Sequence, residues 1–287
     1  YKSMGTPPFS CGGVHLAIKR KGIKVMMTRE EYIESLRKLD LKVYFMGKRI
    51  ENPVDHPIIR PSLNSVAMSY ELAQKDEYKD LMTATSNITG KTINRFCHIH
   101  QNAGDLVKKV KMQRLMGQKT AACFQRCVGM DAFNAIFSTT YEMDKKHGTE
   151  YHKRFVKYLE MVQERDLVVD GAMTDPKGDR SLSPSQQPDP DMFLHITEIR
   201  PDGIVVCGAK AHQTGAVNSH EHLIMPTQAM KEEDKAYAVS FAIESDAPGI
   251  IMIYGRQSCD TRKMEEGADI DLGNNTFGGH EALVVFD

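Results

Sequence analysis

Long apolar runs and cysteines are scarce in this sequence of 287 residues. No run of about 18 apolar residues is present, which excludes a membrane-spanning helix, and the N-terminus lacks the continuous apolar core of a secretory signal. The six cysteines are too sparse for a disulfide scaffold, so we expect a cytoplasmic protein with free or metal-bound thiols. The formal net charge of -1 gives no global attraction to nucleic acid or to a membrane.

The sequence also lacks the Gly-x-Gly-x-x-Gly pattern and a regular alternation of strands and helices, so a Rossmann cofactor site is not expected. Apolar residues make up 41% of the chain and charged residues 26%, which is typical of a globular protein. The length allows one large or two ordinary domains. We expect a flexible extension over residues 1–26, a helical domain over 27–166 and a β-domain over 167–287.

The predicted extension contains several glycines and prolines and shows no periodicity. Met27, a candidate for the natural start, opens the first predicted helix, in which Thr28 and Glu31 form a capping box. Further helices are predicted at residues 62–74, 104–115, 119–146 and 150–164, with breaks near Gly90, Gly117 and Gly148.

Short strands dominate the remaining sequence. One is predicted at residues 43–46, before a turn at Gly47; the others are at 167–173, 192–199, 203–210, 221–225, 237–243, 250–254 and 283–286. Many short strands at this spacing predict an antiparallel β-sandwich or barrel, which gives an α+β fold class. Because the last strand runs directly into Asp287, we expect the polypeptide to be truncated.

The sharpest local feature is the pair Cys123 and Cys127. On a helix, a spacing of four residues places two thiols on one face, as a zinc ion or an iron–sulfur cluster requires. The alternative is two core cysteines. Cys97, His98 and His100 are the nearest candidates to complete a zinc site.

Three polar segments could bind a ligand. The loop at residues 173–180 concentrates hydroxyl, amide and cationic donors that would suit phosphates or the polar edge of a flavin, unless it is only a charged turn. A second cluster, at residues 211–222, includes His220 and His222, but the spacing does not match a zinc hydrolase and favours an orienting role. Glu281 follows two glycines and is a candidate acid or base.

These segments together carry a resemblance to a known family. The phrases are Lys-Met-Gln-Arg-Leu-Met-Gly-Gln-Lys-Thr from Lys111, Cys-Phe-Gln-Arg-Cys-Val-Gly-Met-Asp-Ala-Phe-Asn-Ala from Cys123, Asp-Gly-Ala-Met-Thr-Asp-Pro-Lys-Gly-Asp-Arg from Asp170, Gly-Ala-Lys-Ala-His-Gln-Thr-Gly from Gly208 and the segment from Tyr254 to Asp271. They resemble the 4-hydroxybutyryl-CoA dehydratase / vinylacetyl-CoA isomerase family over residues 27–287. The cysteine phrase is the most specific, because the related flavin hydroxylases acting on 4-hydroxyphenylacetate lack this pair.

The resemblance implies an acyl-CoA dehydrogenase-like fold whose C-terminal four-helix bundle is missing here. It implies FAD and a [4Fe-4S] cluster as cofactors, with Cys123 and Cys127 as two of the four cluster ligands and Glu281 near the flavin and the substrate. The implied flavin-binding residues are Met173, Thr174, Asp175, Pro176, Lys177, Gly178, Asp179, Arg180, His212, Gln213 and Thr214. An acyl-CoA substrate and a homotetramer are also implied, with neither nucleic acid nor membrane as partner.

The implied reaction is dehydration of 4-hydroxybutyryl-CoA to crotonyl-CoA by a flavin radical mechanism, in which the cluster assists departure of the 4-hydroxyl group. A chain ending at Asp287 would hold two of four cluster ligands, so we expect it to be inactive alone. The alternatives are a flavin-dependent aromatic monooxygenase of the same fold and a non-enzymatic module with zinc at Cys97, Cys123 and Cys127.

Overall fold

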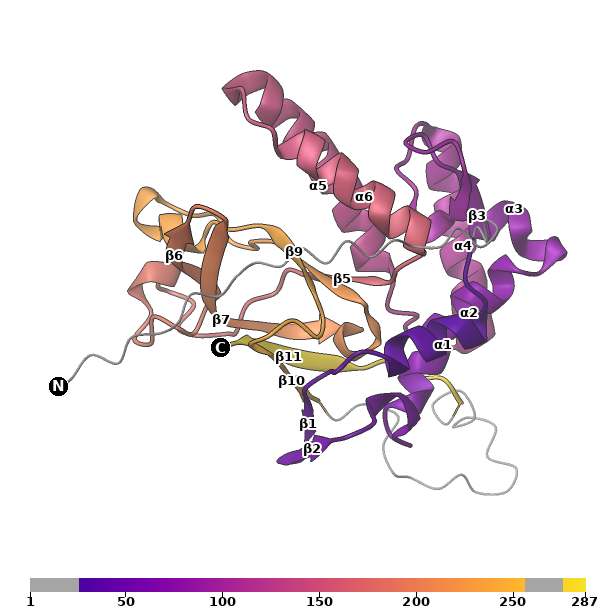
Figure 1. The fold of residues 1–287 in the computed structure, drawn as a ribbon, viewed down its shortest axis with the longest axis horizontal. Coiled ribbons are helices and arrows are strands. Elements are labelled where there is room, and N and C mark those ends of the chain that lie inside the picture. The colour runs from indigo at the N-terminus through magenta and orange to yellow at the C-terminus, as the bar shows by residue number, and fades with distance from the viewer. Residues whose placement is uncertain (1–25, 256–275) are drawn as a thin grey trace.

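The computed structural model describes residues 26–255 and 276–287, so the predicted extension over residues 1–26 lies almost entirely outside the described part, as do Cys11 and Cys259. Helices gather at one end of the molecule and most strands at the other (Figure 1). The helices are α1 (Arg29–Arg37), α2 (Arg60–Ala73), α3 (Lys79–Met82), α4 (Ala103–Thr120), α5 (Cys127–His147) and α6 (Tyr151–Arg165). None of the described helices has the length and apolar character needed to cross a bilayer.

The predicted start of the first helix is confirmed. The Thr28 hydroxyl accepts a hydrogen bond from the Glu31 N–H at 3.2 Å, and the Glu31 carboxylate accepts one from the Thr28 N–H at 2.8 Å. Helix α1 buries Tyr32 and Leu36 against α2, where the rings of Tyr32 and Tyr70 stack with centroids 4.6 Å apart.

Helices α5 and α6 form a hairpin that projects from the sheets, side by side (Figure 1). The predicted break at Gly148 is confirmed: this glycine ends α5 with φ of 66°, a left-handed conformation that glycine adopts without steric cost. The predicted break near Gly117 is wrong. Helix α4 continues through Gly117 to Thr120, and the chain is non-helical only from residue 121 to 126.

The strands form three sheets. The bounds are β1 (Val43–Phe45), β2 (Lys48–Ile50), β3 (Thr83–Thr85), β4 (Thr92–Asn94), β5 (Val169–Ala172), β6 (His195–Arg200), β7 (Gly203–Thr214), β8 (Glu221–Ile224), β9 (Phe241–Glu244), β10 (Ile250–Tyr254) and β11 (Glu281–Phe286). The largest sheet has the order β2-β1-β10-β11-β7-β6, the second β5-β8-β9, and β3 pairs with β4 alone. The two larger sheets share a core that includes Ile224 from one and Met252 and Val284 from the other.

The predicted antiparallel sandwich or barrel needs correction. Strands β1 and β10 pair in parallel, as do β5 and β8, and the six-stranded sheet is open among the described residues, with β2 and β6 as its edges. Parallel neighbours require long crossovers, and β1 and β10 are indeed about 200 residues apart in the chain. Strands β1 and β2 thus come from the N-terminal region but belong to the sheet of the C-terminal region.

Candidate active site

The two predicted metal ligands lie at the junction of α4 and α5. Cys127 is the first residue of α5, whereas exposed Cys123 lies in the preceding non-helical segment. The prediction that both are on one helix is therefore wrong. The thiols still meet: a hydrogen bond from Cys127 lowers the pKa of Cys123 to about 6, although partial burial and the Glu281 carboxylate oppose the shift.

Buried Gln125 explains why the helix is interrupted. Its side-chain amide donates hydrogen bonds to the carbonyl oxygens of Ser62 at 2.9 Å and Gly278 at 3.0 Å, and its oxygen accepts one from Asn218 at 2.9 Å. Its φ of 62° is a left-handed conformation that a helix does not allow. These tertiary bonds hold the cysteine segment against α2 and against the residues that precede β11.

Arg126 anchors the other side of the same segment. Its guanidinium lies 4.8 Å from the ring centroids of both Tyr70 and Phe96, and it donates to the Ser69 hydroxyl at 2.8 Å. The Cys97 sulfur is 3.9 Å from this guanidinium and is fully enclosed, so burial raises the pKa of Cys97 to about 12. Cys97 is thus a protonated core thiol, whereas Cys123 is exposed.

The zinc alternative is not supported by this arrangement. Within residues 26–255 and 276–287, no group of three or more His, Cys, Asp or Glu side chains could hold a metal ion. His98 instead faces Asp105, with its Nε2 atom 3.2 Å from the carboxylate. Cys123 and Cys127 are two soft sulfur donors in contact, a donor type that zinc and iron–sulfur clusters prefer.

Two glycines set the distance between α5 and β5. A Cβ atom on Gly129 would overlap the carbonyl oxygen of Val169, and one on Gly171 would overlap Val128. Because neither glycine has a side chain, the first turn of α5 lies directly on β5. The cysteine at the start of α5 is therefore close to the strand that leads into the predicted flavin loop.

Lys210 supports the predicted flavin loop, residues 173–180, from the protein interior. This buried ammonium donates to the Met173 and Met225 carbonyl oxygens, both at 2.9 Å, and to the Asp175 carboxylate at 2.6 Å. Burial lowers the pKa of Lys210. Buried Gln213 similarly donates to the Thr174 carbonyl oxygen at 2.8 Å. Asp175 and Gln213, both predicted flavin contacts, thus already have partners within the protein.

The remaining predicted contacts in this loop are accessible. Met173, Thr174, Lys177, Gly178, Asp179 and Arg180 are exposed, and Pro176 is half-buried. The loop keeps its shape through Gln187, whose side-chain oxygen accepts a hydrogen bond from the Asp179 N–H at 2.9 Å. Exposed donors on a supported loop can face a ligand.

Glu281 and His212 lie on neighbouring strands. The carboxylate of Glu281 is 3.2 Å from His212 Nδ1, and Glu281 pairs with Thr214 across β11 and β7. His212 has φ of 59°, a strained value for a residue with a side chain, and such strain is concentrated at functional sites. Both side chains are about half exposed, so they can reach a ligand.

His280, which was not among the candidates predicted from the sequence, supports the start of β11 from inside the protein. It is fully buried, its Nε2 accepts a hydrogen bond from the Val217 N–H at 3.2 Å, and its Nδ1 is 3.1 Å from the Ser62 hydroxyl. Burial lowers the pKa of His280 to about 3, so it stays neutral. Alternation along a strand places His280 on the face opposite to Glu281, a signal that was present in the sequence.

The second histidine cluster lies inside the protein. His222 faces the buried carboxylate of Asp170 at 3.2 Å, and His220 accepts a hydrogen bond from the Val168 N–H at 3.0 Å. His220 also lies 2.8 Å from the Ser35 hydroxyl. These contacts join α1, β5 and β8, in agreement with an orienting role.

Comparisons with known proteins give consistent results. Residues 28–287 match the family described as 4-hydroxyphenylacetate 3-hydroxylase N terminal. The chain is 73% identical over 263 residues to a 4-hydroxybutyryl-CoA dehydratase/vinylacetyl-CoA-Δ-isomerase of Clostridium aminobutyricum, which covers 92% of this chain and 54% of that protein. It is 28% identical to an FADH2-dependent monooxygenase of Burkholderia cepacia, over 81% of this chain and 45% of that protein.

Among solved structures, an oxygen-tolerant archaeal 4-hydroxybutyryl-CoA dehydratase from N. maritimus has the same fold. It matches with a TM-score of 0.86 and 57% identity over 91% of this chain and 52% of that one. The chain thus spans about half the length of the relatives that it matches.

Proposed function

Because this chain belongs to the family described as 4-hydroxyphenylacetate 3-hydroxylase N terminal, we propose which of that family's reactions it serves. It forms the N-terminal part of an enzyme that dehydrates 4-hydroxybutyryl-CoA to crotonyl-CoA and isomerises vinylacetyl-CoA. The observation that carries the proposal is the 73% identity to a dehydratase of that name over 92% of the chain.

The cysteine segment supports a place for an iron–sulfur cluster. Cys123 and Cys127 would bind two irons of a [4Fe-4S] cluster, which would act as a Lewis acid toward the departing hydroxyl group. The two thiols are in contact, and Cys123 is exposed, so a cluster could reach both sulfur atoms from the same side. The other two ligands would come from the rest of the complete protein.

The segment that follows β5, around Thr174, and the end of β7 at Thr214 support an FAD site. FAD would supply one-electron chemistry. The exposed residues of the 173–180 loop, with His212 and Thr214, would contact the flavin, while Lys210 and Gln213 hold the backbone of that surface. A monooxygenase relative is named for its reduced flavin, which agrees with a flavin on this fold.

Glu281 is the proposed acid or base. It is accessible, it lies beside the cysteine segment, and His212 orients its carboxylate through the 3.2 Å contact. Its part in the reaction is to take or return a proton at the carbon skeleton of the acyl-CoA. The buried, neutral His280 keeps the strand bearing Glu281 in place.

The complete protein would add a C-terminal helical bundle in an acyl-CoA dehydrogenase-like arrangement and would assemble as a homotetramer. A second candidate function is that of a flavin-dependent aromatic monooxygenase, favoured by the family description and by the 28% identity to such an enzyme. The two differ in substrate and in their need for oxygen.

The test uses the complete protein with this sequence, purified without oxygen. We expect conversion of 4-hydroxybutyryl-CoA to crotonyl-CoA without added reductant, and iron and sulfide in the preparation. Cys123→Ser and Cys127→Ser should lower both iron content and turnover, whereas Cys207→Ser, on β7, should lower neither. Oxygen-dependent hydroxylation of a phenol with no dehydration would establish the second candidate instead.

A further inference from the structure

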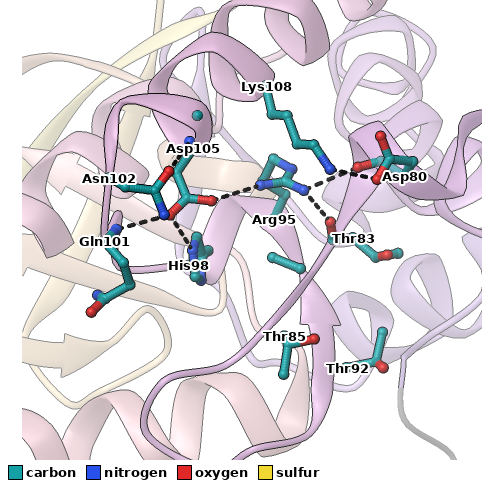
Figure 2. Close-up of a pocket in the computed structure, with 12 residues that line it drawn as sticks. Asp80, Thr83, Thr85, Thr92, Arg95, His98, Gln101, Asn102, Asp105 and Lys108 are labelled. Carbon is teal, nitrogen blue, oxygen red and sulfur yellow. Dashed lines mark hydrogen bonds and ion pairs between the residues drawn. The ribbon is translucent and has the colours of Figure 1, made fainter.

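A polar cavity of about 580 Å³ lies between the β3–β4 hairpin and the start of α4 (Figure 2). His98, a candidate zinc ligand in the sequence, lines it, whereas the predicted cluster and flavin residues do not. Its wall includes hydroxyl groups of Thr83, Thr85 and Thr92 from the hairpin, and Gly104, Asp105 and Lys108 from α4.

Arg95 reaches this cavity from a buried position, with 3% of its surface exposed. Its Nε donates to the Leu81 carbonyl oxygen at 2.7 Å and its Nη2 to the Asp80 carbonyl oxygen at 3.0 Å. Its Nη1 has no hydrogen-bond acceptor: Asp105 Oδ1, at 3.7 Å, forms an ion pair but is beyond hydrogen-bonding distance. A buried cationic N–H group without an acceptor is costly, so this is a position for an acceptor from a ligand.

Asp105, His98 and the start of α4 also lie at this cavity. The Asp105 carboxylate already accepts from the Gln101 N–H at 2.8 Å and faces His98 Nε2, while His98 Nδ1, also buried, has no hydrogen-bond partner (Figure 2). The positive end of the 18-residue helix α4 meets the cavity. The Asn102 side-chain oxygen caps this helix by accepting a hydrogen bond from the Asp105 N–H at 3.2 Å, and it lies beside Gly104.

We propose that this cavity binds a phosphate-type oxyanion. Arg95 Nη1 would donate from the buried side, the positive end of α4 would attract the negative charge, and Lys108 would approach from the rim, where it now pairs with Asp80. The volume exceeds that of one phosphate ion, so the oxyanion is either free phosphate or a phosphate carried by a larger molecule such as an acyl-CoA.

The first test titrates inorganic phosphate into the complete protein by calorimetry. We expect saturable binding that Lys108→Gln weakens about fivefold, the scale of a partly exposed ion pair. Asp105→Asn should tighten binding, because it removes the negative charge closest to Arg95. Lys109→Gln is the matched control: this lysine is the next residue of α4 but pairs with Asp131, outside the cavity.

Competition then identifies the source of the oxyanion. Displacement of phosphate by CoA but not by dephospho-CoA would assign the site to the ribose 3′-phosphate of the thioester substrate, which dephospho-CoA lacks. An absence of competition would assign the site to free phosphate. The absence of saturable phosphate binding, or equal losses in the Lys108→Gln and Lys109→Gln variants, would overturn the proposal. Phosphate binding requires no turnover, so this result is independent of the proposed dehydration.

Discussion

Cys123 lies directly against Gly279: a Cβ atom at position 279 would be 3.4 Å from the Cβ of Cys123. This contact connects the segment before α5 to the segment before β11, which carries Glu281 two residues later. The proposed cluster ligand and the proposed acid or base are therefore neighbours, although about 158 residues separate them in the chain.

This contact predicts a graded effect of side-chain size at position 279. Gly279→Ala should be accepted, because 3.4 Å is an ordinary van der Waals separation, whereas the branched side chain of Gly279→Val should displace Cys123. The iron content per chain of the complete protein should then fall in the valine variant and stay normal in the alanine variant. Equal iron in both would show that the position of Cys123 does not depend on this contact.

Lys210 predicts a connection between a buried ion pair and flavin binding. Lys210→Met would remove the ammonium 2.6 Å from the Asp175 carboxylate and the donor to the Met225 carbonyl oxygen, while the Met173 carbonyl oxygen would keep the Thr227 hydroxyl as a donor. The loss of stability should be about 3 kcal/mol, and the affinity for FAD should fall as the 173–180 loop loosens. Flavin fluorescence titration and urea denaturation measure the two effects. Lys235→Met, in an exposed helical turn, is the control and should change neither.

Buried Asp166 predicts a specific pH dependence of stability. Burial raises the pKa of Asp166 from 3.8 to about 7, so between these values the folded state holds a proton that the unfolded state has lost. Stability from this group is therefore fully present below about pH 4 and is lost as the pH rises through 7, by up to about 4 kcal/mol.

Asp166→Asn should remove this dependence. Asparagine keeps the shape and accepts the left-handed φ of 52° found there. Relative to the unsubstituted protein, the variant should become more stable as the pH rises from 5 to 8, as urea denaturation at both values would show. Asp202→Asn, in the exposed turn between β6 and β7, provides the control. A constant difference between Asp166→Asn and the parent would contradict the raised pKa.

Two helical glycines should respond in opposite directions to the same substitution. Gly129→Ala would force a Cβ against the Val169 carbonyl oxygen and should destabilise the protein by about 2 kcal/mol. Gly117→Ala, in α4 with no atom within 4 Å of the added Cβ, should stabilise it by about 0.7 kcal/mol, because alanine restricts the unfolded chain. If both variants shifted the melting temperature in the same direction, close packing of α5 on β5 would not explain the effect of Gly129→Ala.

Local sequence signals determined much of the outline. The capping box at Thr28 and Glu31 and the glycine at position 148 fixed helix ends through contacts within a few residues. Alternating and continuous apolar runs located most strands after residue 167. The resemblance carried by whole phrases, rather than any single residue, indicated the family that the comparisons then matched.

Tertiary contacts decided the rest. Residues 121–126 contain no glycine or proline that would predict the interruption between α4 and α5. The interruption is stabilised by hydrogen bonds from Gln125 and Arg126 to residues of α2. A continuous helix would not allow these hydrogen bonds. The parallel pairing of β1 with β10 depends on a crossover that no local pattern encodes. The side-chain amide of Gln213 is of a type that contacts ligands, but here it donates to the carbonyl oxygen of Thr174, 39 residues earlier in the chain. Sequence fixes what each side chain can do, and burial and long-range partners select which of those possibilities is realised.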